Sequence, residues 1–353
     1  MALPATTYDT ATLVNPGSSL TDFTLIVDLS RMSAAWWSAV DTSDGTKGRA
    51  AKDSGQTELA CDWIDFDSVN ETGLLRVKWS GTLASSGTQT LRVYPPQAAN
   101  ASVAASDTYG SDNAYDANWI GYWPAHEAAG DLIDRTSNGL DAFANGTPTR
   151  SVTGQIGDAV SLDGSTTSFE VSSFPVTAEA FTMMAWAQGN TASDVLMVLG
   201  STTANDAFSL YSAQSGGVKL AAGVTGTTGS LTGILPFSGW WHGAGVWSTT
   251  TSRTAYLDGV AGTTDTFDSS GLNVSSGTSL GLGCTPRYNG QEWNGPIQHW
   301  QFHDTARSSD WIEHEYEQTN DQATFWGTWT NTPVAGGISI PVVMHHRRMM
   351  GVS

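Results

Sequence analysis

The sequence has 353 residues, a length that predicts two domains, each large enough for its own hydrophobic core. Its 34 acidic and 15 basic side chains give a net charge of −19, which argues against nucleic acid and anionic membranes as partners. Only 14% of the residues are charged, 38 are glycine, and no apolar run could insert into a membrane, so many short strands and turns are expected.

The amino-terminal residues 1–20 are polar and contain Pro4 and Pro16, which indicates a lead-in or attachment segment. Residues 1–15 lack a basic region followed by an apolar run, so no signal peptide is predicted and synthesis in the cytoplasm is expected. For Cys61 and Cys284, which are far apart, free buried thiols are favoured over a disulfide between the domains.

The first domain is predicted to be a β-sandwich over residues 1–97. Pro95-Pro96 closes it, and the small residues after Gln97 indicate a linker over 98–113. Apolar alternation predicts strands at Phe23–Leu29, Glu58–Phe66, Leu74–Trp79 and Thr88–Tyr94, and a short helix within Met32–Val40.

The second domain, over residues 114–330, is organised around Trp240–Trp247. In an extended strand, residues 241, 243, 245 and 247 share one face, and residues 242, 244 and 246 share the other. After Ser248–Arg253 the alternation resumes, and Asp258-Gly259 predicts a tight turn. Further strands are predicted at Phe181–Trp186, Val195–Leu199 and Phe208–Tyr211, and one substantial helix from an N-cap at Ser309 to about Asn320.

Several segments of the second domain resemble a known family. "WWHGAGVW" followed by "SRTAYLDGV" resembles laminin-G-like domains of the concanavalin A-like superfamily, in which a Trp-His strand, a short turn and a strand ending in Tyr-x-Asp-Gly recur. Gly130–Gly139, Asn294–Ile297 and Ala306–Ile312 fit the same family, so the resemblance spans about residues 119–327. It implies an all-β chain of two β-sandwiches, the second a laminin-G-like jelly roll with one short C-terminal helix.

The first domain resembles an uncharacterised β-sandwich family that precedes laminin-G-like domains in bacterial and phage chains. The matching residues are Thr57–Leu59 with Asp62-Trp63, then Gly73–Trp79, then Thr90–Tyr94. That family ends in a Tyr-Tyr-Gly-like strand, whereas this chain has Val93-Tyr94-Pro95-Pro96, and no activity comes with the resemblance.

Residues 331–353 are predicted to be a C-terminal docking tail. The strand-like Ile338–Met344 is followed by His345-His346-Arg347-Arg348, a basic extension on an acidic chain. Docking onto another subunit and return to its own domain are equally compatible with this pattern.

No catalytic residue is predicted. Asp65 and Asp67 alternate as a carboxylate pair could, but no partner can be nominated for them. Glu313 and Glu317 are one helical turn apart, as on a solvated face. The Gly-x-Ser-x-Gly pattern at Gly277–Gly281 lies between strand-like stretches, whereas a nucleophile elbow needs a strand-to-helix turn.

Two binding sites are candidates. Calcium prefers six to eight oxygen ligands, and Asp131, Asp134, Asn138 and Asp141 concentrate oxygens in one loop, although an Asx-turn loop holding only itself together gives the same pattern. Sugars pack on aromatic faces while amides orient their hydroxyls, which favours Tyr288, Asn289, Gln291 and Trp293, although burial at an interface would also explain these residues.

The resemblance implies a non-catalytic structural protein of a tailed phage: a head decoration, a fibre or a tail adhesin in the virion. Its expected partners are other virion subunits, further copies of itself and a host surface glycan, with neither nucleic acid nor membrane insertion. The alternatives are a polysaccharide-degrading enzyme, which needs a carboxylate pair in a cleft, and a non-viral bacterial surface adhesin.

Overall fold

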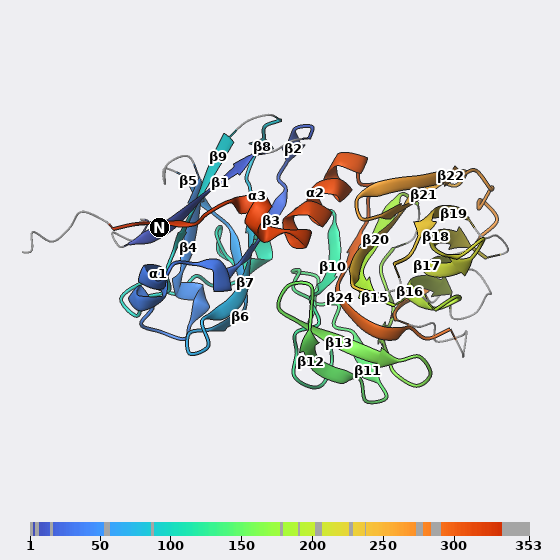
Figure 1. The fold of residues 1–353 in the computed structure, drawn as a ribbon, viewed down its shortest axis with the longest axis horizontal. Coiled ribbons are helices and arrows are strands. Elements are labelled where there is room, and N and C mark those ends of the chain that lie inside the picture. Colours follow the sequence, from blue (N-terminus) through green and yellow to red (C-terminus); the bar gives the residue numbers. More distant parts are fainter. Residues whose placement is uncertain are drawn as a thin grey trace, which may run out of the picture.

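The computed structural model describes residues 3, 7–14, 17–52, 57–85, 88–176, 179–189, 191–201, 207–225, 229–236, 238–272, 278–283 and 291–333. Antiparallel strands form two β-sandwiches, and the helices α2 (Ser309–Asn320) and α3 (Gln322–Trp326) lie between them (Figure 1). The predicted all-β class with two sandwiches is therefore confirmed. No helix in the described ranges is long and apolar enough to cross a membrane.

The first sandwich is built from a five-stranded and a three-stranded sheet, with a two-stranded ribbon at its side. The five-stranded sheet has the order β25 (Thr330–Thr332), β1 (Tyr8–Val14), β9 (Thr88–Tyr94), β4 (Arg49–Lys52) and β5 (Thr57–Leu59). The other strands are β3 (Thr24–Asp28), β7 (Thr72–Lys78) and β6 (Cys61–Asp67), and the pair β2 (Leu20–Thr21) and β8 (Thr82–Leu83). The short helix α1 (Ala34–Ala39) lies within the predicted range, and 3-10 turns occupy Leu29–Arg31, Gly45–Lys47 and Ser111–Asn113.

The prediction of a lead-in segment over residues 1–20 is wrong, because Tyr8–Val14 is strand β1 and lies between β25 and β9. Ala11 and Leu13 point into the core. The Asp9 carboxylate is buried and accepts hydrogen bonds from the Ser33 hydroxyl and from the Asn331 side-chain amide, both at 2.8 Å. The polar residues of this segment led to the wrong prediction, because the hydrogen-bond partners of Asp9 lie far away in the sequence.

The second sandwich packs an eight-stranded sheet on a seven-stranded sheet, and the side chains between them form its core. The first sheet has the order β12 (Thr149–Thr153), β13 (Asp158–Asp163), β24 (Asn294–His303), β15 (Phe181–Gln188), β20 (Trp240–Thr249), β21 (Ser252–Leu257) and β22 (Val260–Asp265), with β10 (Trp119–Trp123) also on β24. The second has the order β11 (Phe143–Asn145), β14 (Ser168–Val171), β23 (Thr278–Leu282), β16 (Val195–Ser201), β17 (Ala207–Gln214), β18 (Val218–Val224) and β19 (Ser230–Ile234).

The predicted strand around Trp240–Trp247 lies near the middle of the eight-stranded sheet, and both of its faces are buried. Trp241 and Trp247 belong to the core of the second sandwich, whereas Ala244 and Val246 face the core that continues from the first. The turn at Asp258-Gly259 is confirmed, since both residues have positive φ angles, 51° and 77°.

Helix α2 is confirmed with one shift, because the N-cap is Ser308 rather than Ser309. Two of its side chains complete the free edge of strand β3. The Gln318 side chain accepts a hydrogen bond from the Ile26 amide at 2.8 Å, and Gln322, one turn later, donates to the Ile26 carbonyl at 3.1 Å and accepts from the Asp28 amide at 3.0 Å. These amides act as a neighbouring strand would, so the edge of the sheet is covered.

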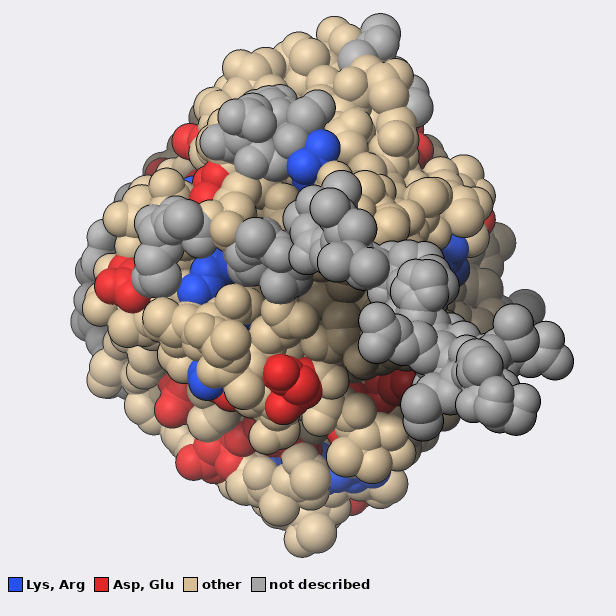
Figure 2. Space-filling model, turned by 90° about the vertical axis from the view of Figure 1, so that its left-hand side faces the viewer, with Lys and Arg blue, Asp and Glu red and all other residues tan. Residues whose placement is uncertain are grey.

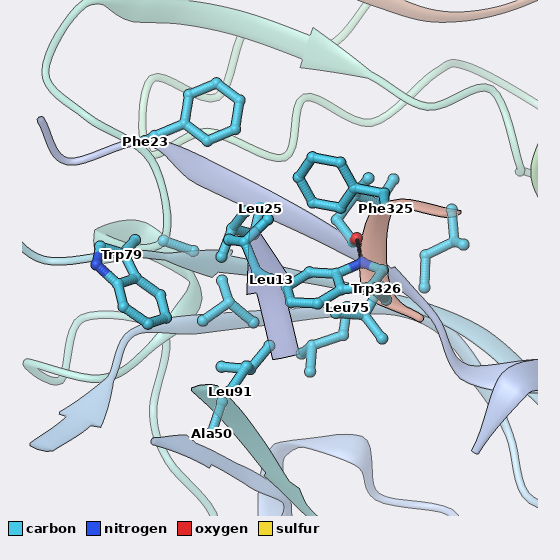
Figure 3. Packing of buried hydrophobic residues seen from close by; sticks show 14 of the residues in the cluster. Leu13, Phe23, Leu25, Ala50, Leu75, Trp79, Leu91, Phe325 and Trp326 are labelled. Carbon is cyan, nitrogen blue, oxygen red and sulfur yellow. Dashed lines mark hydrogen bonds between the residues drawn. The ribbon is translucent and has the colours of Figure 1, made fainter. Parts of the chain in front are cut away.

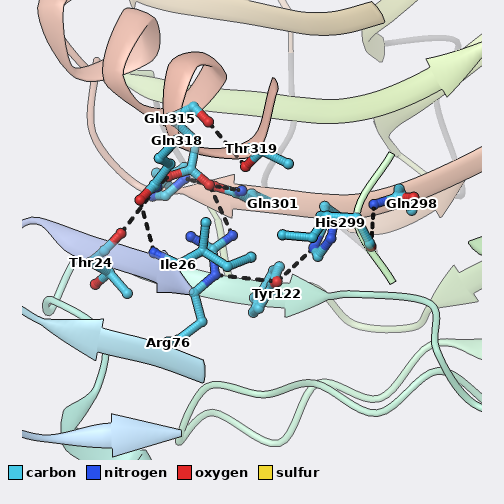
Figure 4. A network of polar contacts seen from close by, with 12 residues as sticks. Thr24, Ile26, Arg76, Tyr122, Gln298, His299, Gln301, Glu315, Gln318 and Thr319 are labelled. Carbon is cyan, nitrogen blue, oxygen red and sulfur yellow. Dashed lines mark hydrogen bonds and ion pairs between the residues drawn. The ribbon is translucent and has the colours of Figure 1, made fainter. Parts of the chain in front are cut away.

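A buried ion pair joins the two sandwiches at the same place (Figure 4). The guanidinium of Arg76 on β7 donates to the carboxylate of Glu315 on α2 at 2.9 Å, and both side chains are buried. Gln301 and Gln318 donate to the same carboxylate at 2.7 and 2.5 Å, and Arg76 also donates to the Tyr122 hydroxyl at 3.3 Å. The charge of Glu315 is therefore matched by donors from both sandwiches.

The apolar core of the first sandwich also receives residues from the end of the chain. Phe325 and Trp326 of α3 pack in the same cluster as Leu13, Leu25 and Leu75 (Figure 3). The indole of Trp326 donates to the Ile26 carbonyl at 2.9 Å, and strand β25 pairs with β1. The first three residues of the predicted tail, 331–333, are thus described and begin in this sheet, whereas residues 334–353 lie outside the described residues.

The predicted linker, residues 98–113, runs along the first sandwich without a strand. The Val103 amide donates to the Thr46 carbonyl and the Cys61 amide to the Tyr109 carbonyl, both at 3.1 Å. Cys61 is a free, buried cysteine, as predicted, while Cys284 lies outside the described residues. The proposed domain boundaries remain predictions.

Candidate ligand-binding site

The outer face of the seven-stranded sheet carries a cavity of about 200 Å³ over strands β16, β17 and β18. Its wall is built by residues of these strands and of two segments beside them. The lining residues are Ser193, Val195, Ala207, Ser209, Tyr211, Gly223, Val224, Thr225 and Gln291.

Strand alternation explains why these side chains face outward. On β17, Phe208 and Leu210 belong to the core of the second sandwich, so Ser209 and Tyr211 point to the opposite side. Ser209 lies between Val198 on β16 and Gly223 on β18 in the sheet register. Because Gly223 has no side chain, nothing projects into the cavity from this position.

The cavity combines an aromatic ring with hydroxyl and amide groups. Tyr211 is partly buried, and burial raises the pKa of its hydroxyl, so the group stays protonated at neutral pH. The Thr225 hydroxyl accepts a hydrogen bond from the Ala207 amide at 2.8 Å, which fixes the end of β18 against β17. Such a set can hold a small polar ligand with an apolar face.

A pair of carboxylates lies beside the cavity, in the segments that supply Ser193, Val195 and Gln291. Asp194 is almost fully buried, and its carboxylate accepts a hydrogen bond from the Asn294 amide at 3.2 Å. Burial, helped by the nearby Glu292 carboxylate, raises the pKa of Asp194 to about 6. The Val195 amide donates to the Gln291 carbonyl at 2.9 Å, so the two segments are held together.

Of the predicted sugar ligands, only Gln291 lines the cavity, and Tyr288 and Asn289 lie outside the described residues. A ligand-facing role for the Trp293 ring does not fit the structure. The ring is 0% exposed and packs edge-on to Trp241, with ring centres 5.7 Å apart, in the sandwich core. The sequence placed Trp293 in a loop, but it directly precedes β24 and is turned inward.

The predicted calcium loop uses its oxygens for hydrogen bonds within the protein. The Asp134 carboxylate accepts from the amides of Tyr122, Thr136 and Leu140 at 2.9–3.0 Å. Asp141 accepts from the Asp134 amide at 2.9 Å, Asp131 from the Ala144 amide at 3.0 Å, and the Asn138 side chain donates to the carbonyls of Trp119 and Ile120 at 3.1 Å. Within the described ranges, no group of three or more His, Cys, Asp or Glu side chains is arranged to hold a metal ion.

That loop also joins the two sandwiches. Arg135 forms an ion pair with Asp62 of β6, and the Tyr115 hydroxyl donates to the same carboxylate at 2.7 Å. Nearby, His126 contacts the Asp65 carboxylate at 2.8 Å. Sequence reasoning considered Asp65 only as a member of a carboxylate pair, whereas its partner is a histidine of the second sandwich.

Sequence reasoning also missed Ser209, Tyr211 and Thr225. The signal was present, because Phe208–Tyr211 was predicted as a strand and its alternation already separates Ser209 and Tyr211 from Phe208 and Leu210. What was missing is the identity of the buried face. That depends on which strands of the other sheet pack against β17.

Two antiparallel sheets packed face to face make the second unit a β-sandwich, and the cavity lies on its outer face. Residues 163–313 match the family described as the concanavalin A-like lectin/glucanases superfamily, so the second sandwich contains a concanavalin A-like domain. The resemblance predicted from Trp240–Gly259 is thereby confirmed. No curated protein matches the chain.

Solved structures similar to the chain include domain 4 of AbnA, an extracellular arabinanase from Geobacillus stearothermophilus, in complex with arabinotriose. It is 18% identical with a TM-score of 0.46, over 56% of this chain and 98% of that one. A heptameric pentraxin from Limulus polyphemus is 15% identical with a TM-score of 0.33, over 39% and 69%. The binding domain of botulinum neurotoxin serotype D is 12% identical with a TM-score of 0.39, over 57% and 51%.

Proposed function

We propose that the chain is a non-catalytic carbohydrate-binding protein that takes one residue of a neutral glycan into the cavity over β16–β18. The observation that carries this proposal is the combination of the Tyr211 ring with Ser209 and Gln291 on the outer face of a lectin-like sandwich. A flat ring can pack against the C–H face of a sugar, while an amide and hydroxyls orient its hydroxyl groups.

Size and charge narrow the ligand class. The cavity of about 200 Å³ is smaller than the roughly 300–1,000 Å³ of pockets for drug-sized ligands, so it suits one sugar residue of a longer chain. The net charge of −19 disfavours uronic-acid or sulfated polymers. Neutral polysaccharides are therefore the expected partners.

The test is a glycan array and titration calorimetry with the full chain and two matched variants. Ser209→Trp fills the cavity from the outer face and should weaken binding at least about tenfold, equivalent to about 1.4 kcal/mol. Thr264→Trp places the same side chain at an exposed position on β22 and should bind as the wild type does. Equal binding by both variants would place the sugar elsewhere, and release of free sugars would contradict the non-catalytic role.

We further propose that this carbohydrate-binding chain is a structural component of a tailed-phage particle. The support is the resemblance of Thr57–Tyr94 to a β-sandwich family that precedes laminin-G-like domains in bacterial and phage chains. Mass spectrometry of purified particles from the source should detect the chain at a stoichiometry matching a head or tail protein. Its absence from particles and presence on bacterial surfaces would favour the adhesin alternative.

A further inference from the structure

A second cleft, of about 660 Å³, lies where the corner between α2 and α3 meets strand β1. Thr12 contributes from β1, Tyr316 and Glu317 from α2, and Asp321, Phe325 and Gly327 from α3 and its ends. Most of this wall comes from the segment that leads directly into β25. The cleft is thus built by the part of the chain that precedes the tail.

The cleft has an apolar wall and an acidic rim. The Tyr316 ring is stacked on Trp186 at 5.7 Å, which fixes its position. Glu317 is half-buried and forms no ion pair with any residue in the described ranges, and burial raises the pKa of its carboxyl. A cation placed against Glu317 would offset this cost of burial, and Asp321, the exposed N-cap of α3, adds a second carboxylate to the rim.

Strand β25 has an open edge, which indicates the kind of segment that occupies the cleft. It is the last strand of its sheet, and no described strand pairs with its other side. Thr330 lies opposite Thr10 and Thr332 opposite Tyr8, so the chain leaves β25 in the direction away from Thr12. A segment that reverses after β25 would run back along the open edge towards Gly327 and the cleft.

The residues after β25 have the composition for this return. Gly336-Gly337 suits a reversal, and the apolar Ile338–Met344 suits a strand, with Pro341 acceptable in an edge strand. His345-His346-Arg347-Arg348 then supplies basic side chains. At about 3.3 Å per residue, eleven extended residues from Ile338 reach roughly 35 Å, more than β25 and α3 together require.

We propose that residues 338–348 of the same chain pair with the open edge of β25 and fill the cleft, with Arg347 and Arg348 against Glu317 and Asp321. Figure 2 shows the molecule from the side of the first sandwich, where acidic side chains border a hollow of the surface. A basic segment is attracted to such a face. The open edge and the acidic cleft are thereby covered by one segment.

Disulfide trapping in the full-length chain tests the location. In a Cys284→Ser background, Thr324→Cys combined with Met344→Cys should form an intramolecular disulfide at least roughly tenfold faster than Thr264→Cys with Met344→Cys. Thr264, on β22, is an exposed position outside the cleft. Disulfide-linked dimers would assign the cleft to the tail of a second copy and overturn the proposal, as would a rate equal to the control.

A charge reversal tests the recognition. Glu317→Lys should lower the trapping rate several-fold, and adding Arg347→Glu and Arg348→Glu should restore most of it. Glu313→Lys, an exposed substitution on the same helix, should leave the rate unchanged. If Glu313→Lys and Glu317→Lys have equal effects, the contact between the basic residues and the cleft is refuted.

Discussion

Glu315 lies at the junction of the two sandwiches, where its carboxylate binds groups from both. Its carboxylate is 1% exposed, and its main partner, Arg76, is 239 residues away in the sequence. Two charges buried together are stabilised by each other and by their hydrogen bonds, and removal of one leaves the other unpaired in a medium that solvates it poorly. The pair therefore acts less as added stability than as a requirement for correct docking.

Glu315→Gln should accordingly destabilise the protein by about 3–5 kcal/mol, because Arg76 keeps its charge without a counter-ion. Urea unfolding at neutral pH measures the change, with Glu313→Gln as the exposed control on the same helix. Replacing both partners, Arg76→Met with Glu315→Met, should recover much of the loss. A double variant as unstable as the single one would mean that packing, rather than the unpaired charge, sets the cost.

Three buried histidines make stability depend on pH. Burial lowers the pKa of His242 to about 3, and burial also lowers those of His299 and His303 well below the usual value. In the unfolded chain these residues titrate near 6.5, so below that pH the unfolded state binds more protons and folding stability falls. Well above pH 6.5 the three histidines are neutral in both the folded and the unfolded state, so they no longer change the folding stability with pH.

Between pH 7 and pH 5 the free energy of unfolding should fall by about 2 kcal/mol through His242 alone, and His299 and His303 act in the same direction. Asp194 opposes this trend, because a carboxyl with a pKa raised to about 6 is destabilised when ionised, but a single group offsets at most about 1–2 kcal/mol. Urea titrations at several pH values check the slope. In His242→Phe the slope should be smaller by roughly one proton, and an unchanged slope would contradict the role of His242.

At the scale of the element, strands could be predicted from the sequence where apolar residues alternate. They could not be predicted where polar residues depend on pairing with distant parts of the chain. Thr88–Tyr94 was predicted with the bounds of β9, because its alternation is local information. Strand β1 was missed because Asp9 and two threonines are acceptable there only through sheet pairing and contacts with Ser33 and Asn331. The candidate site follows the same rule: Gln291 was found, but the inward orientation of Trp293 depends on the core around it.

In strand β20, glycines provide the space that the large tryptophan rings need. Gly245 lies beneath the ring of Trp247, and a Cβ atom at this position would be 2.8 Å from that ring and 3.2 Å from the Ala222 side chain. Because Trp247 is fully buried, the ring has no space into which it can move. The Trp-x-Gly-x-Gly-x-Trp spacing is therefore a packing pattern, in which Trp241 covers Gly243 and Trp247 covers Gly245.

Gly245→Val should thus destabilise the protein by about 1–3 kcal/mol through overpacking. Gly233 on β19 is the matched control, since a Cβ atom there meets nothing within 4 Å, and Gly233→Ala should be neutral or slightly stabilising. Thermal unfolding of the two variants gives the comparison. Equal melting temperatures for Gly245→Val and the wild type would show that the Trp247 ring can be displaced without loss.

At the scale of the whole molecule, the two sandwiches share one continuous structure. The first core extends through Trp119 and Ile312 to Ala244 and Val246 on the outer side of β20. The glutamines of α2 and the ion pair of Arg76 add polar contacts across the same junction. Domains joined by small polar interfaces unfold separately, whereas a large apolar junction couples them.

The molecule should therefore unfold as one cooperative unit, which cavity-forming substitutions in the separate cores can test. Trp293→Ala in the second sandwich and Trp37→Ala in the first should each cost about 3–5 kcal/mol. If the sandwiches are coupled, each substitution also lowers the hydrogen-exchange protection of core amides in the other sandwich by a comparable amount. Trp293→Ala should then lower protection at Val27, and Trp37→Ala should lower it at Met183. If each substitution lowers protection only within its own sandwich, the buried junction docks two independent domains instead of uniting them.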